Sequence, residues 1–130
     1  MGAPAILVVD DEEAVRAVVK KFLEHSGYQV LEAGGGEEAL HLLWQQRFAI
    51  ALLLTDIMMP GISGIELAAE AIKVQPELPV LFMSGYCGQY GDSLNGNQCV
   101  QKPFNLQELL RQVVRTLQPD RIHDRCTRWP

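Results

Sequence analysis

The chain has 130 residues, 48% of them hydrophobic, which is enough for one ordinary core and too few for two domains. Its formal net charge of −5 offers no broad basic surface, so we expect no direct contact with nucleic acid. The first apolar run, Ala5 to Val9, is too short for a secretory signal or a membrane span. We therefore expect a single-domain cytoplasmic protein without membrane insertion.

Short apolar runs alternate with amphipathic stretches along the whole chain. In chain order, the expected strands are Ala5 to Val9, Tyr28 to Leu31, Ile50 to Leu54, Pro79 to Met83 and Gln98 to Gln101. Four helices are expected from apolar stripes at helical spacing, namely Val15, Val18, Val19 and Phe22; Ala39, Leu40, Leu43 and Trp44; Ile65, Ala68, Ala69 and Ile72; and Leu106, Leu109, Leu110, Val113, Val114 and Leu117. This alternation predicts an α/β fold with a doubly wound, five-stranded parallel sheet and helices on both faces.

One crossover departs from the alternation. Between the fourth and fifth strands, the segment Tyr86 to Gln98 contains Gly88, Gly91 and Gly96 and has no helical stripe. Each glycine costs about 1 kcal/mol of helix propensity relative to alanine, so we expect a short or irregular fourth helix here. The last helix ends before Pro119, and we expect residues 119–130 to form a disordered tail.

The three cysteines, Cys87, Cys99 and Cys126, are odd in number and show no CxxC spacing. This arrangement predicts neither a disulfide framework nor a zinc site. We expect buried or incidental thiols, because a free cysteine usually behaves as a small hydrophobic residue.

Polar residues collect where the predicted strands end. Asp10 and Asp11 follow the first strand, Asp56 the third, Ser84 the fourth and Lys102 the fifth. The carboxyl ends of parallel strands share one edge of the sheet, where ligands bind in doubly wound folds. Asp11 alone would also suit the N-cap of the first helix. Three converging acids, however, repel one another unless a cation holds them, and oxygen ligands predict Mg²⁺.

The same residues predict nucleophilic chemistry at a carboxylate. A buried strand would hold Asp56 rigidly while its carboxylate attacks an activated phosphoryl group. Mg²⁺ and Lys102 would neutralise the charge, and the Ser84 hydroxyl would donate to an anionic oxygen on Asp56.

Four sequence motifs occur in order at the strand ends: "ILVVDDEE", "LLLTDIMMPGISGIEL", "PVLFMSGY" and "QKPF". With them the chain strongly resembles the receiver domain of two-component response regulators, and most of all the receivers of hybrid sensor histidine kinases. The resemblance places a receiver domain over residues 1–118 and implies a flavodoxin-like sheet of strand order 2-1-3-4-5. The chain would be either a stand-alone receiver or a piece of a hybrid kinase.

By this resemblance, each residue at the strand ends has a role. The implied site comprises the phosphoacceptor Asp56, the direct Mg²⁺ ligand Asp11, Asp10 acting through water, the Met58 backbone carbonyl as a further metal ligand, the switch hydroxyl of Ser84 and the phosphate-binding Lys102. The implied donor is a sensor histidine kinase or a histidine phosphotransfer domain, and a weak homodimer would fit. The protein would be a regulatory phosphoacceptor that assists its own phosphorylation and dephosphorylation, not an enzyme acting on a separate substrate.

Two features depart from the family pattern, and three alternatives stay open. Cys99 stands where the family usually carries a rotating aromatic, and the segment 86–98 lacks a regular helix. A flavodoxin-like FMN carrier is disfavoured because Asp10 and Asp11 would repel the ligand phosphate. A haloacid-dehalogenase-type phosphatase needs DxD rather than DDE. A phosphorylation-independent pseudo-receiver, acting as a binding module, usually lacks one of the acids or the lysine.

Overall fold

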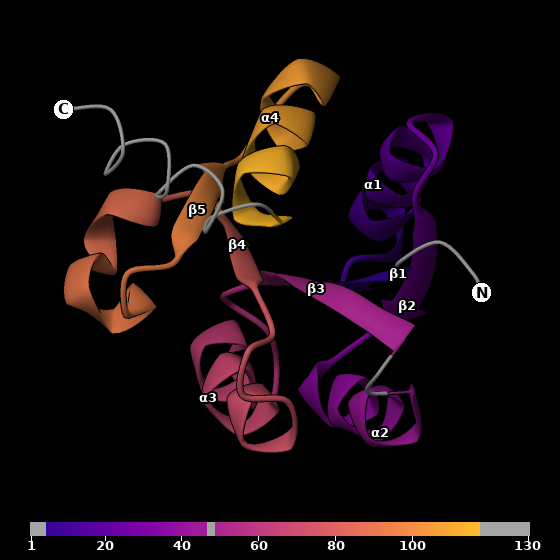
Figure 1. Cartoon of the computed structure of the whole chain (residues 1–130). Coiled ribbons are helices and arrows are strands. Elements are labelled where there is room, and N and C mark those ends of the chain that lie inside the picture. The colour runs from indigo at the N-terminus through magenta and orange to yellow at the C-terminus, as the bar shows by residue number, and fades with distance from the viewer. Residues whose placement is uncertain (1–4, 47–48, 118–130) are drawn as a thin grey trace, which may run out of the picture.

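The computed structural model describes residues 5–46 and 49–117, which build one parallel five-stranded sheet (Figure 1). The strands are β1 (Ala5–Val9), β2 (Gln29–Ala33), β3 (Ile50–Asp56), β4 (Val80–Ser84) and β5 (Gln98–Gln101). They lie in the order β2-β1-β3-β4-β5, and every adjacent pair is parallel. The predicted fold class and strand order are therefore confirmed. The predicted tail 119–130 and Cys126 lie outside the described residues.

In the part of the chain that the structure describes, four α-helices cover the two faces of the sheet. They are α1 (Glu13–His25), α2 (Gly36–Gln46), α3 (Gly64–Val74) and α4 (Leu106–Leu117). In Figure 1, α1 and α4 lie on one side of the sheet, and α2 and α3 lie on the other. Within the described ranges, no helix has both the length and the apolar character needed to cross a bilayer.

The sheet separates two hydrophobic cores, one under each pair of helices. Alternate residues of β1 point to opposite faces, so that Leu7 joins the core under α2 and α3 while Ile6 joins the core under α1 and α4. All five residues of β1 are buried, as expected for a strand of a parallel sheet with helices on both faces. This double burial fixes the position of the strand ends, where the candidate site lies.

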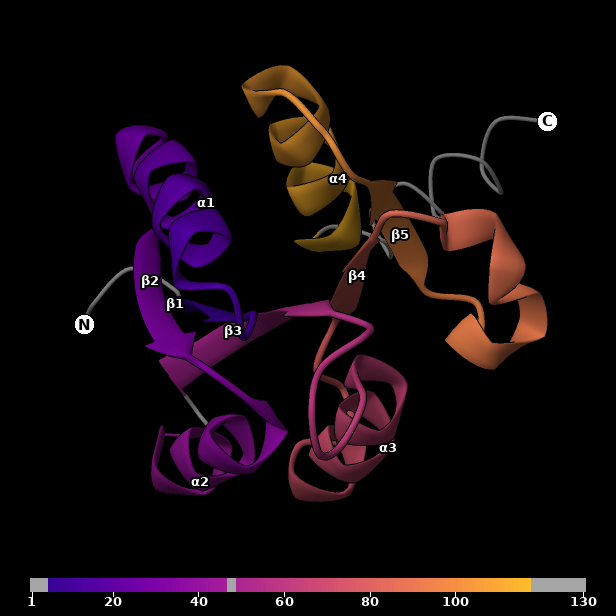
Figure 2. The same cartoon turned by 180° about the vertical axis from the view of Figure 1, so that it is seen from behind.

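The crossover from β4 to β5 contains two short 3₁₀ turns in place of an α-helix, η2 (Cys87–Gln89) and η3 (Gly91–Leu94). Gly91, Asn95 and Gly96 have positive φ angles of 44°, 54° and 83°, which no α-helix accommodates. The prediction of an irregular fourth helix is confirmed. Figure 2 shows this segment standing beside β5, at the edge of the sheet.

The prediction of unpaired thiols was wrong for two of the three cysteines. Cys87 of η2 and Cys99 of β5 form a disulfide, with their Cα atoms 5.8 Å apart. These residues are separated by 12 positions in the sequence, and only the path of the irregular crossover brings them together. Their spacing matches none of the sequence patterns from which disulfides are recognised.

Some residues of the predicted apolar stripes do not face the core. Val18, Trp44, Ile72 and Val114 are 49%, 61%, 41% and 44% exposed. The physical reason is clearest for α3, where Leu67 and Ala71 face the core in place of Ala69 and Ile72. Ala69 and Ile72 instead line a groove of about 470 Å³ between α3 and the crossover, which carries no α-helix to cover it.

Candidate phosphoacceptor site

Three carboxylates meet at the carboxyl ends of β1 and β3. Val9 pairs with Thr55 in the parallel register, so Asp10 and Asp56 follow at the same edge of neighbouring strands. One oxygen from each of Asp10, Asp11 and Asp56 lies within 4.8 Å of the others. Asp10 is fully buried and Asp56 is 8% exposed, whereas Asp11 is exposed. The structure thus brings the three predicted acids together.

The backbone around Asp56 is held by hydrogen bonds and by close packing. The Thr55 hydroxyl donates to the Asp56 carbonyl oxygen at 2.8 Å, and the Ile57 amide donates to Asp56 Oδ1 at 2.9 Å. The Gly64 amide, at the start of α3, donates to the Ile57 carbonyl oxygen at 2.8 Å. A Cβ at Gly64 would collide with the Asp56 backbone, so this approach of helix to strand requires glycine.

Lys102 reaches the acids from the end of β5. Its Nζ lies 3.2 Å from Asp10 Oδ2 and 3.3 Å from Asp56 Oδ1. Its backbone amide donates to the Ser84 carbonyl oxygen at 2.7 Å, which ties the end of β5 to the end of β4. The Lys102-Pro103 peptide is cis, a feature that the sequence motif does not reveal. The structure thus brings Lys102 together with Asp10 and Asp56.

Burial and neighbouring charges together set the pKa values of Asp56 and Lys102. Burial raises the pKa of Asp56 above its usual range, Lys102 lowers it in part, and the neighbouring Asp10 raises it further. For Lys102, burial lowers the pKa, but attraction to Asp56 and Asp10 outweighs burial and the net pKa is raised. The ammonium therefore stays charged and compensates the two buried carboxylates.

Asp11 does not cap the first helix, so the structural alternative for this residue was wrong. The N-cap of α1 is Glu12, whose side chain makes no capping hydrogen bond. The Glu12 amide instead donates a hydrogen bond to Asp10 Oδ1 at 2.9 Å. Asp11 is exposed, and one of its carboxylate oxygens lies within 4.8 Å of an oxygen of each of the two buried acids.

Ser84 is the last residue of β4 and is 5% exposed. Asp56 pairs with Met83 across the sheet, so Ser84 lies one position beyond Asp56 at the same edge. Its Oγ accepts a hydrogen bond from the Tyr86 amide at 3.1 Å. Accepting this bond leaves the hydroxyl proton for donation, since a hydroxyl can do both. Donation to Asp56 stays a prediction.

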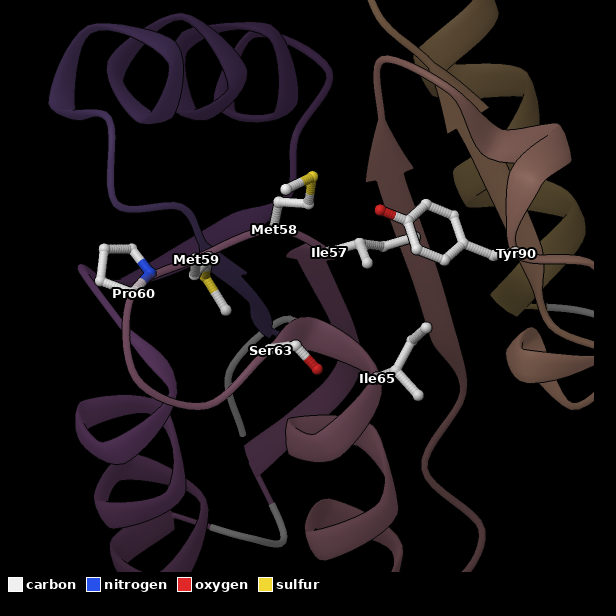
Figure 3. Close-up of a pocket in the computed structure, with 7 residues that line it drawn as sticks. All are labelled: Ile57, Met58, Met59, Pro60, Ser63, Ile65 and Tyr90. Atoms are coloured by element: carbon white, nitrogen blue, oxygen red, sulfur yellow. The ribbon is translucent and has the colours of Figure 1, made fainter.

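A pocket of about 450 Å³ lies along the loop from β3 to α3, which follows Asp56 (Figure 3). Its lining consists of Ile57, Met58, Met59, Pro60, Ser63, Ile65 and Tyr90. The Met58 side chain is 71% exposed, and the role of its backbone carbonyl stays a prediction. Tyr90 comes from the crossover and was missed by sequence reasoning, because that segment has no periodicity that would assign its side chains to a face.

The family model described as response regulator receiver domain matches residues 6–114, most of the chain. The chain is a response regulator receiver domain. As a receiver domain it is part of two-component signalling, and neither the flavodoxin-type carrier nor the dehalogenase-type phosphatase describes it. No observation favours the pseudo-receiver alternative, because the receiver keeps its acids and lysine together in the site.

Its relatives include stand-alone and hybrid proteins. The receiver is 34% identical to the response regulator receiver protein CpdR of Brucella abortus, over 86% of this chain and 95% of CpdR. It is 39% identical to the solved receiver domain of the hybrid histidine kinase CckA, with a TM-score of 0.77 and coverage of 88% and 99%. The match to the whole sensor kinase CckA of Brucella abortus spans only 13% of that protein.

A third relative was solved with ligands. The response regulator TrrA of Thermotoga maritima, in complex with Mg²⁺ and beryllofluoride, is 36% identical to this receiver. The two structures align with a TM-score of 0.76 over 87% of this chain and 98% of TrrA.

Proposed function

We propose that Asp56 accepts a phosphoryl group from a phosphohistidine in a Mg²⁺-dependent reaction. The observation that carries this proposal is the position of the Lys102 ammonium between Asp10 and Asp56, with Asp11 beside them. One cation among three carboxylates leaves excess negative charge. Such a site suits a metal ion and an incoming phosphoryl group that the metal and Lys102 hold together.

Asp56 supplies the nucleophile. The Ile57 amide and Lys102 both contact its Oδ1, so Oδ2 is the oxygen that these two donors do not hold. In the proposed step, an oxygen of Asp56 forms a bond to phosphorus while the bond from phosphorus to the histidine nitrogen breaks, leaving a neutral imidazole after protonation. Rigid anchoring by β3 keeps the carboxylate oriented for this in-line approach.

Lys102 and Ser84 would bind the transferred group. A phosphoryl group carries about −1.5 to −2 charges and three strong acceptor oxygens. Lys102 would offer charge-assisted hydrogen bonds to these oxygens, and the Ser84 hydroxyl would donate its proton to one of them. Ser84 ends β4 and Lys102 directly follows β5, and the Lys102 amide donates to the Ser84 carbonyl oxygen, so a movement of one residue is transmitted to the other.

The donor set fits Mg²⁺. The ion prefers hard oxygen ligands and is usually held by one or two carboxylates, and three carboxylate oxygens gather here within 4.8 Å. We assign Asp10, Asp11, Asp56 and the Met58 carbonyl to this ion, which would neutralise developing charge on the phosphoryl oxygens. The complex of TrrA with Mg²⁺ and beryllofluoride supports the assignment.

The proposed donor is a sensor histidine kinase or a histidine phosphotransfer domain, as the two-component family implies. The receiver would act as a regulatory phosphoacceptor that assists its own phosphorylation and dephosphorylation. Its similarity to CpdR over nearly all of that protein, and to the receiver of CckA, supports both a stand-alone and a hybrid context. The cytoplasmic location stays a prediction of the sequence.

The test is incubation with acetyl phosphate, followed by intact-mass measurement. We expect one added phosphoryl group in the presence of Mg²⁺ and almost none after chelation. Asp56→Asn should abolish the addition, whereas Asp92→Asn, at an exposed acid of η3, should leave it unchanged. Addition that persists in Asp56→Asn would overturn the assignment.

A further inference from the structure

The disulfide between Cys87 and Cys99 closes the crossover into a covalent loop. Cys87 begins η2, three residues after Ser84, and Cys99 lies in β5, three residues before Lys102. The disulfide therefore joins the segment that follows Ser84 to the strand that precedes Lys102. Both of these residues are proposed to bind the phosphoryl group. Figure 2 shows this segment beside β5, at the edge of the sheet.

Hydrogen bonds connect the disulfide to the site. The Cys87 amide donates to Gln101 Oε1 at 3.0 Å, and Gln101 Nε2 donates to the Gly85 carbonyl oxygen. Gln101 immediately precedes Lys102, and Gly85 immediately follows Ser84. The Gln101 side chain thus bridges the start of the crossover, and the disulfide holds that bridge in place from the Cys87 side.

Both cysteines are within reach of a reductant. They are partly exposed, and Gly88 and Gln89, next to Cys87, are exposed. Cys99 also packs against the core under α2 and α3, together with Tyr90 and Leu94 of the crossover. Reduction would therefore leave the hydrophobic contacts of the segment in place and remove only its covalent closure.

We propose that Cys87 and Cys99 form a reversible dithiol–disulfide site that controls how the crossover responds to phosphorylation. In the disulfide form, the closed loop restricts the movement of residues 88–98 when Ser84 and Lys102 turn toward the phosphoryl group. In the dithiol form, the loop is free to rearrange. This inference rests on the proposed function of Asp56, because it concerns the output of that phosphorylation.

The size of the Cys99 side chain bears on which element responds to phosphorylation. The cysteine side chain is too small to act as the rotating aromatic that the family resemblance implies at this place. In this proposal the crossover backbone, which has no α-helix and several positive φ angles, is the element that rearranges. A disulfide across the crossover reduces the number of conformations that its backbone can adopt.

The redox step balances with ordinary thiol chemistry. A dithiol reductant attacks one sulfur, passes through a mixed disulfide and leaves as a cyclic or protein disulfide, while Cys87 and Cys99 gain two electrons and two protons. A small disulfide such as oxidised glutathione performs the reverse exchange. In the cytoplasm, the location that the sequence predicts, disulfides are usually transient and often serve redox sensing.

The test measures hydrogen exchange across residues 86–98 in four states, namely oxidised and reduced protein, each with and without beryllofluoride as a phosphoryl mimic. A Cys126→Ser background removes the third thiol. We expect slow exchange with little response in the oxidised form. In the reduced form we expect exchange about tenfold faster, with a clear change when the mimic binds. Cys87→Ser and Cys99→Ser variants should behave as the reduced form under oxidising conditions.

Fluorine NMR of the same samples reports binding of the mimic separately from the loop response. Equal loop responses in the two redox states, with the mimic bound in both, would overturn the dithiol–disulfide control and leave the proposed function standing. Two free thiols in the Cys126→Ser protein after treatment with oxidised glutathione would overturn it as well. If the mimic bound in neither redox state, the proposed function would be overturned. The dithiol–disulfide control would fall with it, because it depends on phosphorylation of Asp56.

Discussion

Replacing Gly64 with alanine should damage both the fold and the candidate site. Gly64 begins α3 where the helix passes closest to the end of β3. A Cβ there would lie 2.9 Å from the carbonyl carbon of Asp56 and from Ile57 Cα, and closer still to the Asp56 carbonyl oxygen. Ordinary contact begins at 3.4 Å, so the two carbon contacts alone require the backbones to separate by about 0.5 Å, and the closer contact with the carbonyl oxygen requires more.

The magnitude follows from what that separation disrupts. The neighbours are backbone atoms rather than flexible side chains, which places the overpacking cost near the upper end of its range, about 3 kcal/mol. Weakening the bond from the Gly64 amide to the Ile57 carbonyl costs about 1 kcal/mol more, and the better helix propensity of alanine returns about the same. We expect Gly64→Ala to lower the free energy of unfolding by about 3 kcal/mol and the Tm by roughly 10 °C.

The assay is urea denaturation combined with the rate of phosphorylation by acetyl phosphate. Displacement of Asp56 should slow phosphorylation by about 10-fold to 100-fold in protein that is still folded. Gly35→Ala is the matched control, since a Cβ there meets nothing within 4 Å. If Gly64→Ala matched wild type in both stability and rate, the account of the contact between α3 and Asp56 would be refuted.

Three further predictions concern charge. Asp11→Ala should leave metal-free stability within about 0.5 kcal/mol, because Asp11 is exposed, but should abolish stabilisation by Mg²⁺ in thermal melts; strong metal-free destabilisation would contradict this. Lys102→Met should cost about 3 kcal/mol in urea denaturation by leaving the buried Asp10 unpaired, and Mg²⁺ should restore part of the loss. A hydrogen bond with Lys20 lowers the pKa of Glu32, so the Glu32 charge stabilises the fold above about pH 4.5, and this contribution is lost as the pH falls through the lowered pKa. Glu32→Gln should therefore lower the Tm by about 2 °C at pH 7 and by less toward pH 3, and a pH-independent difference would refute the ion pair.

The sheet could be predicted from the sequence because short apolar runs alternate regularly with amphipathic stretches along the chain. Continuous apolar runs such as Ile50 to Leu54, alternating with amphipathic stretches, indicate strands of a parallel sheet covered on both faces, and polar residues directly after such strands are expected at the shared carboxyl edge. The convergence of Asp10, Asp56 and Lys102 follows from that topology alone. The structure adds the distances and the buried state of Asp10, which single-sequence patterns do not contain.

Features that depend on packing between distant segments could not be predicted. The pairing of Cys87 with Cys99 requires the path of the crossover, and thiol spacing does not encode that path. The exposure of Ile72 has a similar cause, because an apolar stripe on α3 indicates burial only if another element covers it. The N-cap of α1 went to Glu12 rather than Asp11, a shift of one residue that propensity does not resolve.

The most direct test of the central claim is chemical trapping of the phosphorylated residue. An acyl phosphate is reduced by borohydride to an alcohol, so phosphorylated Asp56 should be converted to homoserine, which peptide mass spectrometry locates. We predict homoserine at position 56 alone, only after treatment with a phosphodonor and Mg²⁺. Homoserine at Asp10 or Asp11, or no conversion at Asp56 in fully phosphorylated protein, would contradict the account.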